Sequence, residues 1–353
     1  MRRRVTIKDV AKEANVSIKT VSNVLNHSGS MRPETRERVK TAMIKLGYQI
    51  NMSARSLKTG ATGILGLGIF DFTQPFGAYL ADKVIETARE RKYGVVVSTY
   101  SSGGSGIRTI IDETYHLAAD GWIFFVERPL RDKGILLSQT YPLVMTGDYR
   151  PYGKADFVTM PNTEAERFAT GRLLDAGCRR LALVGAPAKY SRRSVFSAVE
   201  GTQELRVRGY IQAFEERGLE VDSSLIVSLP RLMTDEGIKA ADFLLDDHPD
   251  VDGIICLNDA VAYGVMHQVQ KRGRSIPEDI QVVGFDNTPE GSYSNPALTT
   301  IDPLIDDYAR VAVSMLIERI NGYAGPVRTY TTGFELVERD STQVGKDADK
   351  MTP

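Results

Sequence analysis

Residues 6–26 read TIKDVAKEANVSIKTVSNVLN, and this stretch decides how the N-terminal part of the chain folds. Apolar residues recur at the spacing of one helix face, at Ile7, Val10, Ala11 and Ala14. Thr6 precedes this run and Asp9 follows three residues later, a pattern typical of a capped helix start. A short turn at Asn15 and Val16, with Ser17 as a second cap, predicts another helix that reaches about Asn26.

A third helix is predicted from Pro33, a favoured first helical position, to a stop at Gly47. Its inner face would consist of Val39, Ala42, Met43 and Leu46. Two helices joined by a tight turn let the second helix lie in the major groove of DNA. Residues 6–47 therefore predict a small all-α DNA-binding unit.

The outward residues near the start of the second helix would reach the edges of the bases, and these are Ile18, Lys19, Ser22 and Asn23. Lys19 can donate to guanine, and Asn23 can pair with adenine. Ser17 and Thr20 are better suited to phosphates. The pattern leaves Ile18 open between a thymine methyl contact and packing against the inner face of its own helix.

The net charge of −1 conceals an uneven distribution along the chain. Residues 1–60 carry 13 Lys and Arg residues against four acidic ones, a net charge of +9. The remainder carries 31 basic and 41 acidic residues, a net charge of −10. A basic head on an acidic body indicates a polyanionic partner for the head alone.

From Gly63 onward apolar strands alternate with helical segments, after a stretch at residues 49–62 that has little apolar periodicity. Strands are predicted in two series, at Ile64–Phe70, Val95–Tyr100, Trp122–Val126 and Leu143–Thr146, then at Leu181–Gly185, Leu225–Leu229, Gly253–Leu257 and Ile280–Phe285. Helices are predicted between them at Ala78–Arg91, Ile107–Ala119, Thr163–Ala176, Leu205–Arg217, Glu236–Leu245 and Ala260–Arg272. This alternation predicts parallel sheets with helices on both faces, in two similar lobes.

Composition excludes several classes of protein. A length of 353 residues favours two or three domains, and two cysteines offer no disulfide framework. No apolar stretch approaches the ~18 residues of a membrane span, and the N-terminus lacks the apolar region of a secretory signal. The four histidines show no metal spacing, and enzyme motifs such as a Walker loop are missing. We therefore expect a cytoplasmic protein that needs no cofactor or metal, contacts no membrane and catalyses no reaction.

The sequence resembles the LacI/GalR family of lactose- and galactose-type repressors. In the head the resemblance lies in Thr6-Ile-Lys-Asp-Val-Ala11, Val16-Ser17, Thr20-Val-Ser22, Val24-Leu-Asn26, Arg32-Pro-Glu-Thr-Arg36 and Leu46-Gly-Tyr48, followed by Asn51-Met-Ser-Ala-Arg-Ser-Leu-Lys58. In the body it lies in Leu257-Asn-Asp-Ala-Val-Ala-Tyr-Gly264, Val282-Val-Gly-Phe-Asp286, Leu298-Thr-Thr-Ile301 and the ending at residues 334–342. The motifs follow one another in the family's order over nearly the whole chain.

The resemblance implies a domain plan. Residues 1–48 would form the helix-turn-helix headpiece, 49–62 a hinge helix and linker, 63–342 a two-lobed ligand-binding and dimerisation domain, and 343–353 a tail. The body would have a periplasmic-binding-protein-like α/β fold of two doubly wound lobes. The implied DNA contacts add Thr6 and Asn26 in the headpiece and Ala54, Arg55, Leu57 and Lys58 in the hinge. Leu57 would act as a wedge between base pairs in the minor groove.

The expected ligand site is the cleft between the lobes, because ligands of such sheets bind at the carboxyl ends of strands. Seven candidates lie at those ends, namely Phe70, Asp71, Phe76, Glu127, Asp148, Asn258 and Asp286. Arg206 matches the arginine that contacts ligand in the family. Asn258 could instead only cap the next helix, and Asp286 could be a turn residue. Carboxylates, an amide, an arginine and aromatic faces suit the hydroxyls of a sugar.

These observations predict a homodimeric repressor of genes for carbohydrate uptake or degradation. It would bind a pseudopalindromic double-stranded DNA operator and respond to a small effector, a sugar or sugar derivative. Three alternatives stay open: a regulator that answers to a purine or another non-sugar ligand, a solute-binding module for transport, and an enzyme. The first would differ only in the cleft, and the second should have a signal peptide and no basic headpiece.

Overall fold

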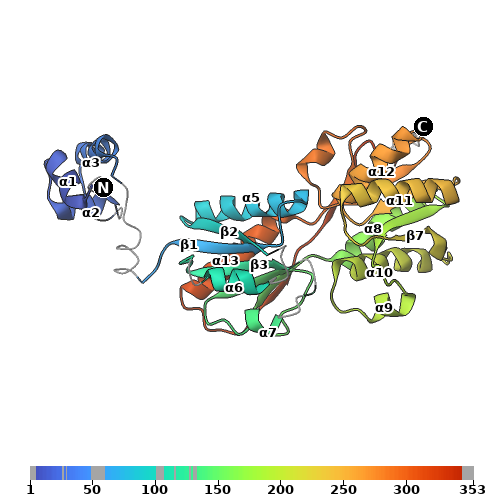
Figure 1. Ribbon diagram of the computed structural model, residues 1–353, viewed down its shortest axis with the longest axis horizontal. Helices are drawn as coiled ribbons and strands as arrows, with labels where there is room; N and C mark the ends of the chain where they lie inside the picture. The colour runs from blue at the N-terminus through green and yellow to red at the C-terminus, as the bar shows by residue number, and fades with distance from the viewer. Residues whose placement is uncertain are drawn as a thin grey trace, which may run out of the picture. The chain divides into compact units, whose positions relative to one another are not determined.

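The computed structural model describes residues 5–25, 28, 30–48, 60–100, 107–114, 117–126, 129 and 133–343. The chain divides into two compact units, Met1–Thr62 and Gly63–Pro353, and each is described by itself. Figure 1 shows the helical first unit and the second unit, which contains both helices and strands.

The described residues of the first unit form three helices, α1 (Ile7–Glu13), α2 (Ile18–Leu25) and α3 (Pro33–Leu46), which confirms the predicted helix-turn-helix. Its core is small and apolar, with Val10, Val21 and Val39 fully buried. The helix starts are capped as the sequence predicts, since the side chain of Asp9 accepts the Thr6 N–H at 2.8 Å. The helix α3 ends at Gly47, whose left-handed conformation (φ +61°) favours glycine.

The first lobe of the second unit is a six-stranded, all-parallel sheet in the order β11-β5-β4-β3-β1-β2. Its strands are β1 (Ile64–Ile69), β2 (Gly94–Thr99), β3 (Gly121–Val126), β4 (Leu143–Gly147), β5 (Asp156–Thr159) and β11 (Thr329–Thr331). Helices α5 (Pro75–Glu90) and α13 (Ile305–Ile320) cover one face, and α6 (Ile107–Thr114) and α7 (Lys133–Leu136) the other.

The second lobe repeats this plan with the sheet order β12-β10-β9-β8-β6-β7, in which only β12 is antiparallel. Its strands are β6 (Leu181–Ala186), β7 (Ile226–Ser228), β8 (Gly253–Cys256), β9 (Gln281–Phe285), β10 (Thr299–Asp302) and β12 (Glu335–Val337). Helices α8 (Asn162–Asp175) and α10 (Thr202–Glu215) cover one face, α11 (Thr234–Asp247) and α12 (Asp259–Lys271) the other, and a short α9 (Arg192–Ser197) precedes α10.

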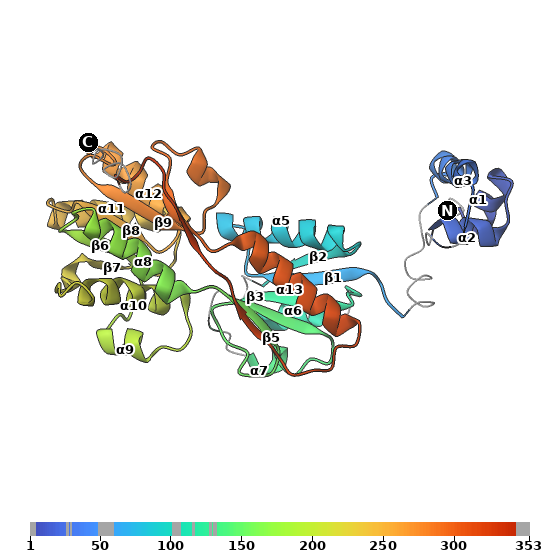
Figure 2. The same cartoon turned by 180° about the vertical axis from the view of Figure 1, so that it is seen from behind.

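The chain passes between the lobes three times: from β5 to α8, from β10 to α13, and from β11 to β12 (Figure 2). Each lobe is therefore assembled from separate stretches of sequence. The carboxyl ends of the strands in the two sheets face each other across these crossovers, which places the loops of both lobes around a shared space.

The structure differs from the sequence-based expectation in several elements. The predicted helix at 107–119 is too long, because α6 ends at Thr114 and Ala118 has a positive φ of +37°, which a right-handed helix does not allow. The predicted strand at 225–229 begins one residue later, after a 3-10 turn at Ser223–Leu225. Helix α13 and the short strands β5, β10 and β11 are not predicted. These strands have three or four residues, too few for a clear alternation.

Candidate nucleic-acid interface and ligand cleft

The first half of α2 presents the side chains that the sequence assigns to DNA. Ile18 is 45% exposed, so it points outward and does not pack in the core. Lys19 beside it is exposed, and Ser22 and Asn23 one turn later are half-buried. These four residues lie on one side of the helix because residues three and four positions apart are neighbours on a helix. This side of α2 therefore presents the ammonium group of Lys19, the amide of Asn23 and the apolar side chain of Ile18.

The flanking polar residues of the head are engaged in local hydrogen bonds. The Ser17 Oγ accepts the Thr20 N–H at 3.0 Å and lies 2.9 Å from the Thr20 hydroxyl, which caps α2. The Thr6 hydroxyl donates to the Asp9 carboxylate at 2.7 Å. The remaining predicted DNA contacts lie outside the described residues, namely Asn26, Ala54, Arg55, Leu57 and Lys58.

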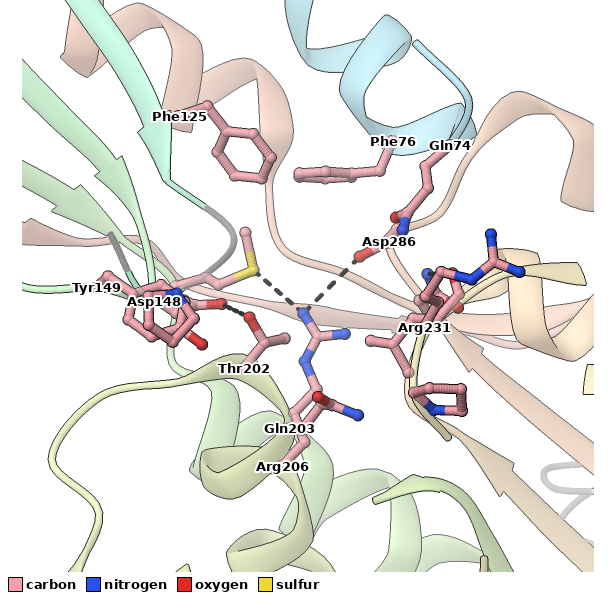
Figure 3. Close-up of a pocket in the computed structure, with 15 residues that line it drawn as sticks. Gln74, Phe76, Phe125, Asp148, Tyr149, Thr202, Gln203, Arg206, Arg231 and Asp286 are labelled. Atoms are coloured by element: carbon pink, nitrogen blue, oxygen red, sulfur yellow. Dashed lines mark hydrogen bonds and ion pairs between the residues drawn. The ribbon is translucent and has the colours of Figure 1, made fainter. Parts of the chain in front are cut away.

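In the second unit a cavity of about 270 Å³ lies between the two lobes. It is lined by Gln74, Phe76, Phe125, Pro129, Asp148 and Tyr149 from the first lobe, by Met160 at a crossover, and by Thr202, Gln203, Arg206, Pro230, Arg231, Leu232, Asn258 and Asp286 from the second (Figure 3). Five of the eight predicted ligand residues are brought together there: Phe76, Asp148, Arg206, Asn258 and Asp286.

Two predicted residues do not line this cavity. The ring of Phe70 packs edge-on against Tyr100, with ring centroids 5.6 Å apart. The carboxylate of Asp71 accepts the Thr73 N–H at 2.8 Å and the Thr73 hydroxyl at 2.6 Å, so it shapes the turn before α5. Because the chain turns at Asp71, Gln74 and Phe76 reach the cavity instead. Glu127 lies outside the described residues.

The first lobe supplies an apolar wall to the cavity. Phe76 at the start of α5 and Phe125 in β3 lie with ring centroids 5.5 Å apart and planes inclined at 53°. Figure 3 shows both rings on the side of the cavity opposite Arg206. Phe125 is not among the predicted site residues, because it lies inside a strand of continuous apolar residues. The alternation of side chains along β3 could have indicated its position. Trp122 and Phe124 pack on one face of the sheet, so Phe125 lies on the opposite face.

The second lobe supplies a fixed cation, Arg206, which is only 3% exposed. Its Nε donates to the Asn162 Oδ1 at 2.7 Å, and its Nη1 donates to the carbonyl oxygen of Leu257. Its guanidinium lies 3.4 Å from the ring centroid of Phe285, and its Nη2 lies 3.8 Å from the Asp286 carboxylate. The guanidinium is therefore held in one orientation, with Nη2 towards the cavity side where Asp286 lies (Figure 3).

Asp148, after β4 of the first lobe, joins the polar side of the cavity. Its Oδ2 accepts the Thr202 hydroxyl at 2.5 Å, and its Oδ1 accepts the Asn162 Nδ2 at 2.7 Å. Neither Asn162 nor Thr202 is predicted from the sequence, and they are the first residues of α8 and α10. Asn162 carries one signal, because it follows closely after the carboxyl end of a strand; Thr202 carries none.

Asp286 has the backbone of a strained residue. Its φ of +117° and the φ of +50° at Asn287 place two consecutive non-glycine residues outside the regions that L-residues favour. The strain is supported by neighbours, since the Asn287 amide donates to Asp302 at 2.9 Å and accepts from Arg339 at 2.6 Å. Such strain is concentrated at functional sites, so the turn reading and the ligand reading of Asp286 are compatible.

Asn258 has a structural role as well as a place in the cavity lining. Its Oδ1 accepts the Val261 N–H at 2.9 Å, which caps α12, and its Nδ2 donates to the Leu232 carbonyl at 3.2 Å. The next residue, Asp259, is fully buried and accepts hydrogen bonds from the Thr300 hydroxyl and the Thr288 N–H at 2.6 and 2.8 Å. Asp259 therefore links β10 and the loop after β9 to α12.

Comparison with known proteins identifies the chain. The model of the bacterial regulatory proteins of the lacI family matches residues 6–51, and that of a periplasmic binding protein-like domain matches residues 170–342. The ribose operon repressor of Halalkalibacterium halodurans is 32% identical over 345 residues, which cover 98% of this chain and 99% of that protein. The chain belongs to the LacI family. It is a DNA-binding transcription regulator, and the family is not one of enzymes.

Other members of the LacI family support this assignment. The HTH-type transcriptional regulator CelR of Thermobifida fusca is 32% identical and covers 91% of this chain and 93% of its own. The crystal structure of a LacI-type transcription regulator from Bifidobacterium animalis subsp. lactis is 54% identical over 79% of this chain and 99% of that chain, with a TM-score of 0.77. The lac repressor dimer bound to operator and the anti-inducer ONPF is 22% identical, and its TM-score of 0.77 shows a shared fold.

Within the described ranges, no three His, Cys, Asp or Glu residues are grouped so that they could hold a metal ion. The same part of the chain has no helix with the length and apolar character that a bilayer crossing requires.

Glu166 on α8 is a buried acid next to this site. It is 1% exposed, and its Oε1 has no hydrogen-bond partner among the described residues. Burial raises the pKa of Glu166 to about 8, and the nearby Arg206 guanidinium only partly offsets that shift. The carboxyl group is therefore largely protonated in the folded LacI-family regulator near neutral pH.

A raised pKa makes the folded state hold a proton that the unfolded state releases, so stability should fall as the pH rises from about 4.5 to about 8. We expect Glu166→Gln, which mimics the neutral acid, to flatten this slope, by up to about 1.4 kcal/mol per pH unit. Urea unfolding of both proteins from pH 5 to 8 measures it. Equal slopes in the two proteins would contradict the assignment of a proton to Glu166.

Proposed function

We propose that this LacI-family regulator represses genes for the uptake or degradation of a carbohydrate, and that a sugar in the interlobe cleft controls its affinity for operator DNA. The observation that carries the proposal is the division of the cleft into an apolar wall, Phe76 and Phe125, and a polar wall with Asp148, Arg206 and Asp286. Relatives named as a ribose operon repressor and as a CelR–cellobiose complex support it.

A sugar ring matches both walls. Its C–H face can pack on an aromatic ring, while its hydroxyls donate to carboxylates and accept from a guanidinium. The charged side chains of the described lining are two carboxylates, Asp148 and Asp286, and two guanidinium groups, Arg206 and Arg231. Their charges balance, which favours a neutral polyhydroxylated ligand over an anionic one.

A purine is the main alternative, and the geometry favours it less. A flat heterocycle stacks best between or upon parallel ring faces. Phe76 and Phe125 are inclined at 53° to each other, so they do not form a parallel-sided slot. Purine bases therefore belong in any screen as the competing outcome.

We also propose that two segments of the chain bind operator DNA. Residues 1–48 read the operator through α2, and residues 49–62 form a hinge that places Leu57 in the minor groove. Two copies of the chain would bind the two halves of a pseudopalindromic operator. The lac repressor, which shares the fold, is bound to its operator as a dimer. Because the target is DNA, the regulator would act in the cytoplasm.

We propose that sugar binding is coupled to operator binding through the connection between the body and the hinge. A sugar that binds one degree of lobe closure better than another shifts the lobes towards that closure. The hinge joins the body just before β1, so the shift changes the separation of the two hinges of a dimer. Operator affinity changes in consequence, and by linkage operator DNA changes sugar affinity by the same factor.

Two measurements test the proposal together. A thermal-shift screen of monosaccharides, disaccharides and purine bases should give stabilisation by at least one sugar, since a ligand that binds only the folded state raises the melting temperature. Operator fragments selected from random DNA by the full chain should then bind with an affinity that this sugar changes. Stabilisation by a purine base alone would replace the sugar, and an unchanged DNA affinity would remove the regulatory link.

Lys19 should contribute to sequence specificity. We expect Lys19→Ala to relax the preference at one base pair of each half-site by about 1–3 kcal/mol, because a good base contact discriminates by that amount. Binding of all single-base variants of the selected operator measures it. Lys40→Ala, which removes an exposed cation of α3 paired with Glu37, is the matched control. A uniform weakening on every operator would make Lys19 a phosphate contact.

A further inference from the structure

The side chain of Asn162 is in contact with a charged group from each lobe. Its Nδ2 donates to the carboxylate of Asp148, in the first lobe, at 2.7 Å. Its Oδ1 accepts from the Nε of Arg206, in the second lobe, at 2.7 Å. The residue is 2% exposed and does not line the cavity, whereas both of its partners do.

Asn162 also lies where the chain first crosses between the lobes, directly after β5 and at the start of α8. Two hydrogen bonds donated by backbone N–H groups join the lobes on the same side, next to the bond from the Thr202 hydroxyl to Asp148. The Gly201 N–H donates to the Asp148 carbonyl at 2.9 Å, and the Arg150 N–H donates to the Glu200 carboxylate at 2.8 Å. The amide therefore lies among the contacts that hold the loop after β4 against the start of α10.

We infer that Asn162 is a positioning residue: its amide couples the two lobes by holding Asp148 and Arg206 in one mutual arrangement, the one in which the cleft is complete. The inference rests on the proposed function for its biological meaning, since the coupled groups are the candidate sugar contacts. The link itself, in which one side chain joins the two lobes, does not depend on the identity of the effector.

Only an asparagine-like group satisfies both partners. The carboxylate of Asp148 requires a donor and the guanidinium of Arg206 requires an acceptor. Aspartate at position 162 would keep the acceptor but oppose Asp148 with a like charge in a buried place. Alanine would leave both charged partners short of a hydrogen bond, which is costly where water is excluded.

Hydrogen exchange of the full chain without ligand tests the coupling. We expect Asn162→Asp to raise the exchange rates of the Arg150 and Gly201 amides about tenfold, because local opening of the lobes breaks the bonds they make. Amides within the sheets, such as Val282 in β9, which bonds to Ser341 at 2.9 Å, should keep their rates. Asn321→Asp, at the exposed end of α13, is the matched control.

A double variant that exchanges the carboxylate and the amide should restore the contact between the lobes. In the double variant Asp148→Asn, Asn162→Asp the new amide can donate to the new carboxylate, which still accepts from Arg206, and the net charge is unchanged. Exchange of Arg150 and Gly201 should return towards the wild-type rate. Unchanged rates in Asn162→Asp, a uniform rise throughout the second lobe, or no recovery in the double variant would each overturn the positioning role.

Calorimetry with cellobiose and with ribose tests whether Asn162 affects sugar binding. A sugar that binds the wild-type protein should bind Asn162→Asp about tenfold more weakly, because the contacts of the two lobes are no longer held in register. Equal affinity in the two proteins would overturn the link to the cleft. If neither sugar binds the wild-type protein, the carbohydrate proposal loses support, while the exchange rates still decide the role of Asn162.

Discussion

Removing residues 1–60 is expected to lower operator affinity at least about 10³-fold, to the level of non-specific binding or below. The deleted segment carries a charge of +9 and the remaining chain −10, so the body alone repels DNA. The two-lobed body should stay folded, because it forms a compact unit with its own cores. Fluorescence anisotropy with the selected operator measures the loss.

The control for this deletion is the melting temperature of the truncated protein, with and without the sugar that stabilises the full chain. Both values should be close to those of the full chain. The full chain should also lose affinity steeply as salt is raised, because each neutralised phosphate releases counterions. Specific operator binding that survives the deletion would show that the head is not the DNA-binding unit.

Arg206→Ala is expected to abolish the sugar response and to destabilise the body by about 3–5 kcal/mol, the usual cost of removing one partner of a buried charged pair. Asn162 and the Leu257 carbonyl each lose a hydrogen-bond donor, and the buried Asp286 carboxylate loses its neighbouring cation. Urea unfolding measures the stability, and calorimetry with the identified sugar measures the binding.

Arg208→Ala is the matched control for this experiment. Arg208 lies two residues further along α10, is half-buried, and donates to the carbonyl oxygens of Val195 and Ala198 outside the cavity lining. Its loss should cost less and should leave sugar binding unchanged. Equal effects of the two substitutions would mean that Arg206 supports only the packing of α10.

The sequence predicts local features of this fold well. The caps at Thr6 and Ser17 depend on residues three positions away, so they can be recognised without tertiary information. The alternation of strands and helices predicts both lobes. It does not predict α13, which returns to the first lobe after the whole second lobe has been completed. Ile18 shows the same limit, because its exposure depends on how three helices pack.

The residues of the cleft are predicted only in part, because some of them depend on tertiary contacts. Asp148, Asn258 and Asp286 follow strands, and the ends of parallel strands are known to gather at one edge of a sheet. Asn162 and Thr202 begin helices, and their importance comes from the approach of the other lobe, which no local pattern encodes. Phe70 and Asp71 satisfy the same strand-end rule as Asp148, yet the turn at Asp71 removes them from the lining.

The three crossovers also bear on how the protein is made. A ribosome delivers the chain from its N-terminus, and domains generally fold as units during synthesis. Here neither lobe can be finished early: the first waits for α13 and β11, and the second for β12 at Glu335–Val337. The nascent body therefore exposes unpaired sheet edges until almost all of its residues have emerged, whereas the three-helix head can fold at once. Chaperone demand during translation should accordingly fall on the body, and premature termination after β10 should yield two incomplete lobes in place of one intact lobe.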